Sequence, residues 1–344
     1  MKFICYSNWS ELPESVNQFF EQSAKRNMFF ARPWFETLVS TTLNSEQSML
    51  LACVIENDSF QAILPLIKNN NGNWEALSHP YGSEFSILIN HINKKDEVIT
   101  CLAQGLSQLS FKSISIKPFD KDDQNIINLK QSFELNGIVC HQGFRFYNWT
   151  CELKDLNFSV YMSKRPSKVR NTIARKDRKL KREHGYNIKL FINDMLEQAM
   201  DDYYKVIQSS WKAKEQYLEL MNELVNRFAK EGCLRLAIMY VDEKPIAAQL
   251  WFVVHRKASI FRLAYNEKWK KYSPGSILTK FLMEYVIETD KVDELDFLTG
   301  NEQYKQDWMT MRKERWEMVC VKTTKPTSKV KQIIANLKRL LKNR

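Results

Sequence analysis

The chain has 344 residues, of which 44% are hydrophobic, and a formal net charge of +11. This length suits about two domains of ~150 residues each, and the hydrophobic share excludes a chain that is disordered throughout. The longest apolar run, AAQLWFVV at 247–254, has the length of a strand and is too short to span a membrane.

The N-terminus and the cysteines favour a cytoplasmic protein. The first residues, MKFICYSNWSELPESV, carry one lysine and too short an apolar stretch for a signal peptide. The seven cysteines are scattered and form no C-x-x-C pair, a pattern typical of reduced thiols without structural zinc. The five histidines show no metal-ligand spacing, so we predict no metal site.

The first half of the chain alternates helix and strand patterns. A short helix is predicted at 30–42, followed at 49–69 by two apolar runs around a polar turn, which is typical of an antiparallel strand pair. A helix at 96–109 and a strand at 112–119 follow. We place the end of a first domain, residues 1–150, just beyond these elements.

The next segment, 161–185, predicts a helix rich in lysine and arginine. Ten basic residues lie between Lys164 and Arg182 against Asp177 alone, a local net charge of +9. Few acids are available there to neutralise the charge, which favours binding of an anionic substrate, and Arg170 and Arg175 represent this face. The alternative is a solvated helix face without a ligand.

The second half repeats the layout of the first. Helices with i, i+3, i+4 apolar spacing are predicted within 197–232, and a strand pair at 234–254 has its turn at 242–245. The repetition indicates tandem related domains, the second being residues 151–325. Such hairpins also occur in unrelated α+β chains, and the pattern alone supports both interpretations equally.

The segment 265–308 carries the strongest functional signal. A strand ends near Tyr265, a Ser-Pro-Gly turn at 273–275 opens a long helix, and a short strand at 291–300 follows. Backbone N–H groups and the positive end of the helix dipole meet at such a turn, which makes it suited to a phosphate. Proline and glycine also begin many helices that bind nothing.

The C-terminal region predicts a strand at 312–323 and then a basic amphipathic helix, 326–344. From Lys322 to Arg344 there are eight basic residues and no acid. This composition is typical of a segment that lies on an anionic membrane surface, so we expect peripheral attachment to the inner membrane face. The alternative is a helix that packs on a domain with a solvated basic side.

The common nucleotide and hydrolase motifs are absent from the sequence. It contains no G-x-x-x-x-G-K-[ST], G-x-G-x-x-G, G-x-S-x-G or H-E-x-x-H. ATPase, Rossmann dehydrogenase, serine hydrolase and zinc protease functions therefore lose their usual support.

The order of the remaining elements resembles the GNAT acyltransferases. The basic helix, the PIAAQL strand, AYNEKWKKYSPGSIL and DFLTGNEQYKQDW are similar to the CelD-like, or BioF-like, acetyltransferase-domain family, which is related to the Fem aminoacyl transferases. The resemblance covers 151–325 well and 28–90 more loosely. It implies an α/β (α+β) protein with tandem GNAT-like folds, each a mixed, mostly antiparallel sheet flanked by helices.

The resemblance also implies an acyl donor bound at the start of the long helix. Acyl-CoA, in particular acetyl-CoA, would be held by Lys270, Ser273, Gly275, Ser276 and Tyr265. The usual signature has Gln or Arg where this chain has Lys270 and glycine where it has Ser273. An aminoacyl-tRNA donor, as in Fem proteins, therefore stays open.

Acyl transfer needs a base, donors for an oxyanion and an acid for the leaving thiolate. The resemblance implies Tyr304 as the acid, and we predict Lys305 to hold a phosphate or developing charge and Asp296 to act as the base. Asp296 could equally be a structural carboxylate. Gln249, Arg170 and Arg175 are predicted to contact the acceptor, an amine or hydroxyl of a sugar, nucleotide-sugar or cell-envelope polysaccharide precursor. The alternative to an enzyme is a basic protein that binds RNA or a membrane surface without catalysis.

Overall fold

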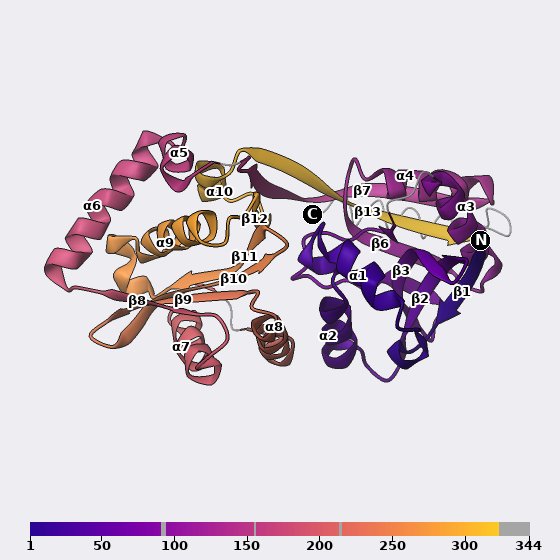
Figure 1. Ribbon diagram of the computed structural model, residues 1–344, viewed down its shortest axis with the longest axis horizontal. Coiled ribbons are helices and arrows are strands. Elements are labelled where there is room, and N and C mark those ends of the chain that lie inside the picture. The colour runs from indigo at the N-terminus through magenta and orange to yellow at the C-terminus, as the bar shows by residue number, and fades with distance from the viewer. Residues whose placement is uncertain (91–93, 155, 213–214, 323–344) are drawn as a thin grey trace. The chain divides into compact units, whose positions relative to one another are not determined.

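The computed structural model describes residues 1–90, 94–154, 156–212 and 215–322, and the chain divides into two compact units. The first consists of residues 1–147 and the described residues from 313 onward, and the second of residues 148–312 (Figure 1). Residues 313–322, which the sequence analysis assigns to the second domain, are thus part of the first unit. The helix predicted at 326–344 lies outside the described residues.

The first unit is built on a mixed sheet in the order β1-β2-β3-β4-β6-β13-β7, with β5 paired to β3. β4 runs parallel to β6, whereas the β1–β2, β2–β3, β3–β4 and β6–β13 pairs are antiparallel. The strands are β1 (Lys2–Tyr6), β2 (Gln47–Glu56), β3 (Ser59–Asn69), β4 (Asn73–Ala76), β5 (Leu88–Ile89), β6 (Ser113–Asp120), β7 (Ile138–Glu152) and β13 (Met311–Lys322).

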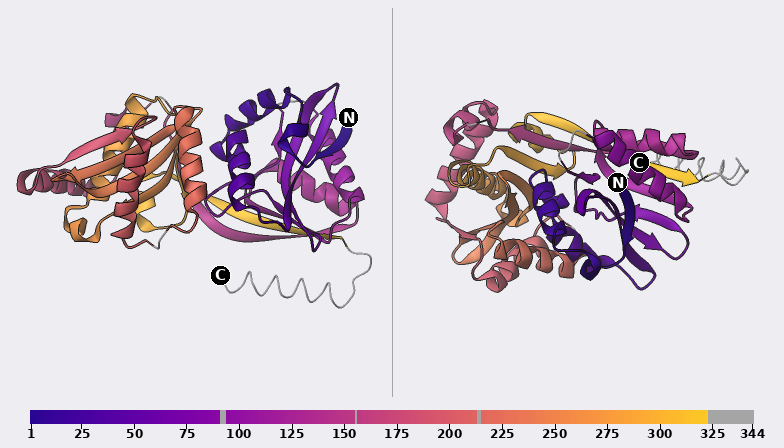
Figure 2. Two further views of the ribbon diagram at one scale, coloured as in Figure 1. Left: turned by 90° about the horizontal axis from the view of Figure 1, so that it is seen from below. Right: turned by 45° about the vertical axis from the view of Figure 1, so that its right-hand side comes forward.

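Helices cover both faces of this sheet (Figure 2). α3 contacts β1, β2 and β3 and pairs with α4, while α1 and α2 contact each other on the other side. The buried side chains of α1 and α2, among them Phe20, Trp34 and Phe35, supply much of the core. The helices are η1 (Trp9–Glu11), α1 (Val16–Ala24), η2 (Met28–Phe30), α2 (Arg32–Thr42), α3 (Lys95–Gln108) and α4 (Gln124–Leu135).

The second unit has a sheet in the order β7-β12-β11-β10-β9-β8, to which β7 contributes its residues from 148 onward. β11 and β12 are parallel, and the other neighbouring pairs are antiparallel. The remaining strands are β8 (Asn187–Phe191), β9 (Leu234–Val241), β10 (Lys244–Val254), β11 (Lys257–Tyr265) and β12 (Glu294–Thr299).

Helices also lie on both faces of the second sheet. α9 packs across β9, β10 and β11 on one face, and α7 and α8 lie on the other (Figure 1). α9 is buried along an apolar stripe that includes Leu278, Leu282 and Val286, which explains the long apolar pattern of its sequence. The helices are α5 (Phe158–Ser163), α6 (Ser167–Glu183), α7 (Leu196–Gln208), α8 (Leu218–Lys230), η3 (Glu267–Tyr272), α9 (Pro274–Glu288) and α10 (Gln303–Trp308).

The tandem arrangement predicted from the sequence is confirmed. Each unit has an antiparallel hairpin, β2–β3 or β9–β10, and then two parallel strands with a helix between them, β4-α3-β6 or β11-α9-β12. The hairpin turns are alike as well, since Asn57 and Asp58 in one and Asp242 and Glu243 in the other have positive φ at both central residues. β7 and β13 are the two strands with residues in both units.

Candidate functional site

The parallel strands β11 and β12 diverge toward their carboxyl ends. Their ladder pairs Lys257–Ser259 with Glu294–Asp296. Beyond it β11 stays paired with β10 as far as Tyr265, and Thr299 of β12 pairs with Asn148 of β7. In α/β sheets, ligands bind outside the carboxyl ends of parallel strands, so this is the first place to look for a site.

The start of α9 lies directly after β11 at this edge. Ser273, the residue before α9, has a left-handed backbone (φ 54°, ψ 48°). Its N–H donates to the carbonyl of Lys270 at 3.0 Å, and its carbonyl accepts from Ser276 at 3.1 Å and Ile277 at 3.3 Å. Because proline has no N–H, the N–H of Gly275 is the one in this turn without a backbone partner among the described residues.

Gly275 is favoured here by a close approach. A Cβ at this position would lie 3.1 Å from Cδ1 of the Tyr265 ring. The same ring contacts Trp211, with ring centroids 4.5 Å apart, and Trp211 itself is half exposed. The predicted donor residues Tyr265, Ser273, Gly275 and Ser276 therefore lie together, next to an aromatic pair.

The basic helix α6 reaches the segment that precedes α9. The Lys176 ammonium donates to the carbonyl of Lys271, and the Lys179 ammonium lies 5.5 Å from the ring centre of Tyr272. Lys270 projects into solvent, with 70% of its side chain exposed and a distant pairing of 4.0 Å to Glu267. The start of α9 is thus bordered by lysines from two elements, which suits an anion.

Arg170 and Arg175 lie on the exposed side of α6. Arg170 donates from Nε to the carbonyl of Arg165 at 3.2 Å, so part of its guanidinium is engaged by the helix end. α6 itself is anchored by the buried Ile173 and Leu180. The structure places both arginines on a charged face and gives neither a position beside Gly275.

Gln249 is fully buried in β10 and its amide is engaged within the fold. Nε2 donates to the carbonyl of Gly275 at 2.9 Å and to Oγ1 of Thr279 at 2.7 Å, and Oε1 accepts from Trp251 Nε1 at 3.0 Å. These bonds fix the first turn of α9 against the sheet. Gln249 thus acts on the site by positioning Gly275.

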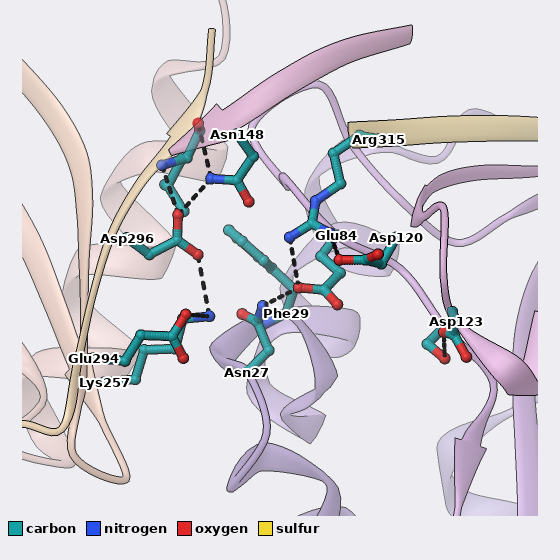
Figure 3. A network of polar contacts seen from close by, with 12 residues as sticks. Asn27, Phe29, Glu84, Asp120, Asp123, Asn148, Lys257, Glu294, Asp296 and Arg315 are labelled. Carbon is teal, nitrogen blue, oxygen red and sulfur yellow. Dashed lines mark hydrogen bonds and ion pairs between the residues drawn. The ribbon is translucent and has the colours of Figure 1, made fainter. Parts of the chain in front are cut away.

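Asp296 lies at the centre of a buried polar network between β7, β11 and β12 (Figure 3). Its Oδ1 accepts from Asn148 Nδ2 at 2.7 Å and from the Leu298 N–H at 2.8 Å, and its Oδ2 lies 3.1 Å from Lys257 Nζ. Lys257 also contacts Glu294 at 3.3 Å. A carboxylate so occupied matches the structural alternative considered from the sequence.

Lys305 is also engaged internally and is 3% exposed. Its ammonium donates to the carbonyls of Phe297, at 3.2 Å, and Thr299, and lies 3.2 Å from Glu302 Oε2. These three contacts use its three N–H donors. Burial lowers the pKa of Lys305, and the charge of Glu302 opposes this shift. Lys305 therefore stabilises the turn after β12 and adds a buried positive charge to it.

Tyr304 is the predicted catalytic residue that remains accessible, with 39% of its surface exposed. Its ring packs edge-on against Phe297 at 5.7 Å between centroids. Burial of part of the side chain, with the nearby Glu302 carboxylate, raises the pKa of Tyr304. The hydroxyl is protonated at neutral pH, and the raised pKa makes it a weaker acid than an ordinary tyrosine.

Two basic residues of this edge were missed by the sequence analysis. Arg262 on β11 pairs through Nε with Glu215 at 3.5 Å, and Lys212 follows Trp211 in the segment after α7. Burial lowers the pKa of Lys212 to about 8, and the charges of Arg262 and Lys305 add to this effect. In the sequence Lys212 carries no motif and is one lysine of a W-K-A-K stretch.

Residues 167–306 match the sequence profile described as Acetyltransferase (GNAT) domain. The chain contains a GNAT-type acetyltransferase domain. The match includes α6, the hairpin, the start of α9 and α10, so the site lies within the GNAT domain. A search among curated protein sequences found no match.

Solved structures support the same fold for the whole chain. FemX has a TM-score of 0.63 at 10% identity, over 92% of this chain and 97% of its own. L-PGS from Bacillus licheniformis has a TM-score of 0.57 at 11% identity, over 97% of each chain. A tandem GNAT protein from the clavulanic acid biosynthesis pathway has 0.50 at 7% identity, over 92% and 97%. The predicted tandem GNAT-like fold is therefore confirmed, as a likeness of fold alone.

In the part of the chain that the structure describes, no group of three or more His, Cys, Asp or Glu side chains is placed to hold a metal ion. A scan of the same residues finds no helix that is both long and apolar enough to cross a bilayer.

Replacement of Lys212 by methionine is expected to stabilise the GNAT domain at neutral pH. The folded-state pKa of about 8 lies below the usual 10.5, so the folded protein disfavours the charged form. The melting temperature of Lys212→Met should exceed that of the wild type by ~2–4 °C or more at pH 7, and the gain should vanish as pH rises from about 8 to 10.5. Scanning calorimetry at pH 7, 9 and 10.5 measures this.

Lys189→Met is the matched control, because Lys189 lies on β8 with half of its side chain exposed. It should change the melting temperature little at any of these pH values. An equal gain for both variants would show that the loss of any lysine stabilises the protein and would contradict a specific cost at Lys212.

Proposed function

We propose that this protein is an acyltransferase that moves an acyl group, acetyl in the simplest case, from acyl-CoA to an amine or hydroxyl. The observation that carries the proposal is the start of α9. It follows β11 where β11 and β12 diverge, leaves the Gly275 N–H without a backbone partner in the described part of the chain, and is bordered by Lys176, Lys270 and Lys271. This arrangement suits the phosphates of a CoA thioester.

The chemistry requires the acceptor to attack the thioester carbonyl and the thiolate to leave. Beyond Ser259 the side of β11 that faced β12 has no ladder partner in β12, so backbone N–H groups there can receive the thioester oxygen as it gains charge. The acceptor adds to the carbonyl carbon, the C–S bond breaks, and the thiolate takes a proton.

Tyr304 is the proposed source of that proton. It is exposed near the carboxyl end of β12, and its hydroxyl can give a proton to the thiolate as the C–S bond breaks. The sequence-based role of Asp296 as the base finds no support in the contacts, because its carboxylate is held by Lys257, Asn148 and Leu298. The acceptor can lose its proton to solvent.

Transfer activity tests this proposal. Thiol release from acetyl-CoA should be detectable with a panel of amino sugars and nucleotide-linked amino sugars, and Tyr304→Phe should lower kcat by about 100-fold with KM little changed. Tyr217→Phe is a suitable control, because Tyr217 is similarly exposed and lies outside α10. Equal activity of Tyr304→Phe and the wild type would remove Tyr304 from the mechanism.

An aminoacyl-tRNA donor is the second candidate. One specific observation favours it. Within the described ranges, the turn before α9 offers one backbone N–H without a backbone partner, that of Gly275, where a pyrophosphate would use several. The structural relatives named FemX and L-PGS share this fold. Thermal protection by an aminoacyl-tRNA with none by any acyl-CoA would decide for this donor and overturn the first.

The acceptor and the location of the reaction are also part of the proposal. We infer a cell-envelope polysaccharide precursor from the resemblance of the SPG and DFLTGNEQYK segments to CelD-like acyltransferases. Arg170 and Arg175 on the exposed face of α6 would contact an anionic part of it. A reaction at the inner membrane face would suit this acceptor and the basic composition of 326–344.

A further inference from the structure

The segment after α7 is held against the end of β11 by two contacts. The carbonyl of Ser209 accepts a hydrogen bond from the Glu267 N–H at 3.2 Å, and the Trp211 ring packs on Tyr265 at 4.5 Å between centroids. Lys212 is the next residue. Its position is therefore set by the same edge of the sheet that carries the start of α9.

Lys212 is a half-buried ammonium without an acidic partner among the described residues. The two nearby acids already have cations of their own, since Glu215 pairs with Arg262 at 3.5 Å and Glu302 with Lys305 at 3.2 Å. Among the described residues at this edge, Arg262 and Lys305 each have an acidic partner, whereas Lys212 has none.

The cluster has an arrangement suited to a bound anion. Lys305 uses its three donors on Phe297, Thr299 and Glu302, so it contributes charge without contact. The Lys212 ammonium keeps its donors available. A partly desolvated cation beside two like charges is unfavourable in the free protein, and an incoming anion relieves both the repulsion and the missing hydrogen bonds.

We propose that Lys212, at the edge of the sheet where Arg262 and Lys305 add positive charge, binds a phosphate or carboxylate group of the acceptor. This rests on the proposed acyl transfer and specifies its substrate class, an amine or hydroxyl compound with an anionic group next to the reacting position. The donor phosphates belong to a different place, at Gly275. Tyr265 contacts Gly275 and also Trp211, the neighbour of Lys212. The aromatic pair therefore connects the two anion positions.

The charged groups around Lys212 determine how its pKa should change when an anion binds. Arg262 on β11 and Lys305 on α10 lower the pKa of Lys212 beyond the effect of burial, and Glu302 acts in the opposite direction. A bound phosphate places negative charge against the ammonium and must raise that pKa. Binding should therefore be accompanied by proton uptake near pH 8.

The test uses inorganic phosphate as the probe and the full chain. Lysines are dimethylated with ¹³C, and the Lys212 resonance is identified as the one missing from Lys212→Met. We expect its pKa near 8 without ligand and an increase of about one unit or more with saturating phosphate. Lys212→Met should weaken phosphate binding at least about tenfold, whereas Lys189→Met should leave it unchanged.

Acetyl-CoA distinguishes this site from the donor site. Lys212→Met should keep thermal protection by acetyl-CoA, and phosphate should bind together with it. Competition between phosphate and acetyl-CoA at Lys212 would assign the cluster to the donor and overturn the proposal. An unchanged Lys212 pKa with phosphate would overturn it as well. If the wild type does not bind acetyl-CoA, the proposed function is contradicted. The phosphate titration then still decides whether Lys212 binds an anion.

Discussion

Gly275→Glu is expected to abolish the thermal protection that acetyl-CoA gives to the wild-type protein. A Cβ at this position would lie 3.1 Å from the Tyr265 ring, and the carboxylate would add a negative charge beside the Gly275 N–H, which has no backbone partner among the described residues and is proposed to bind the donor. Binding should weaken by more than about 100-fold, so millimolar acetyl-CoA should leave the melting temperature of the variant almost unchanged. Differential scanning fluorimetry with increasing acetyl-CoA measures the shift.

Thr289→Glu is the control, because it adds the same charge at the other end of α9, at its exposed C-cap. It should cost at most about 1 kcal/mol of stability through the helix dipole and keep the full acetyl-CoA shift. If Gly275→Glu folds and retains protection equal to that of Thr289→Glu, acetyl-CoA does not bind at the start of α9.

Asp296→Asn is expected to destabilise the second unit by about 3 kcal/mol. The asparagine Oδ1 can still accept from Asn148 and Leu298, so the substitution removes mainly the charge opposite Lys257. An unpaired buried charge is costly, and the value falls at the lower end of the usual ~3–5 kcal/mol because Lys257 keeps Glu294 at 3.3 Å. Equilibrium urea unfolding followed by tryptophan fluorescence gives the free energy.

Asp293→Asn provides the exposed counterpart three residues earlier in the chain. Asp293 pairs with Arg256 at 2.6 Å, but more than half of both side chains is exposed, so its loss should cost ~1 kcal/mol or less. A catalytic base at Asp296 predicts the reverse outcome for the first variant, namely lost activity with unchanged stability. The pair of unfolding free energies therefore separates a structural from a catalytic carboxylate.

Much of the fold could be predicted because its signals are local. Apolar runs around Asn57–Asp58 and Asp242–Glu243 predict hairpins, and the Pro-Gly start of α9 with its long apolar stripe predicts a helix against the sheet. The exchange of β13 into the first unit has no such signal. The residues of β13 predict a strand, but they do not indicate that it pairs with β6, whose partner residues lie 195 or more positions earlier.

Of the candidate site, the sequence could indicate only the part that depends on local backbone conformation. Gly275 is identified by its turn, whereas the roles of Asp296, Gln249 and Lys305 depend on partners that lie far away in the chain, such as Asn148 for Asp296. Lys212 was missed for the same reason. Its importance comes from Arg262 and Lys305, and a single lysine in a polar segment has no pattern that reports such neighbours.

The last described strand also bears on how the protein is made. β13 pairs with β6 from Arg315 to Val321, and its buried Arg315 forms ion pairs with Glu84 and Asp120 of the first unit (Figure 3). During synthesis the ribosome has produced β1 to β7 long before it reaches Arg315. The N-terminal unit must therefore wait, with the edge of β6 uncovered and the half-buried Glu84 and Asp120 without their arginine, until Arg315 has been synthesised.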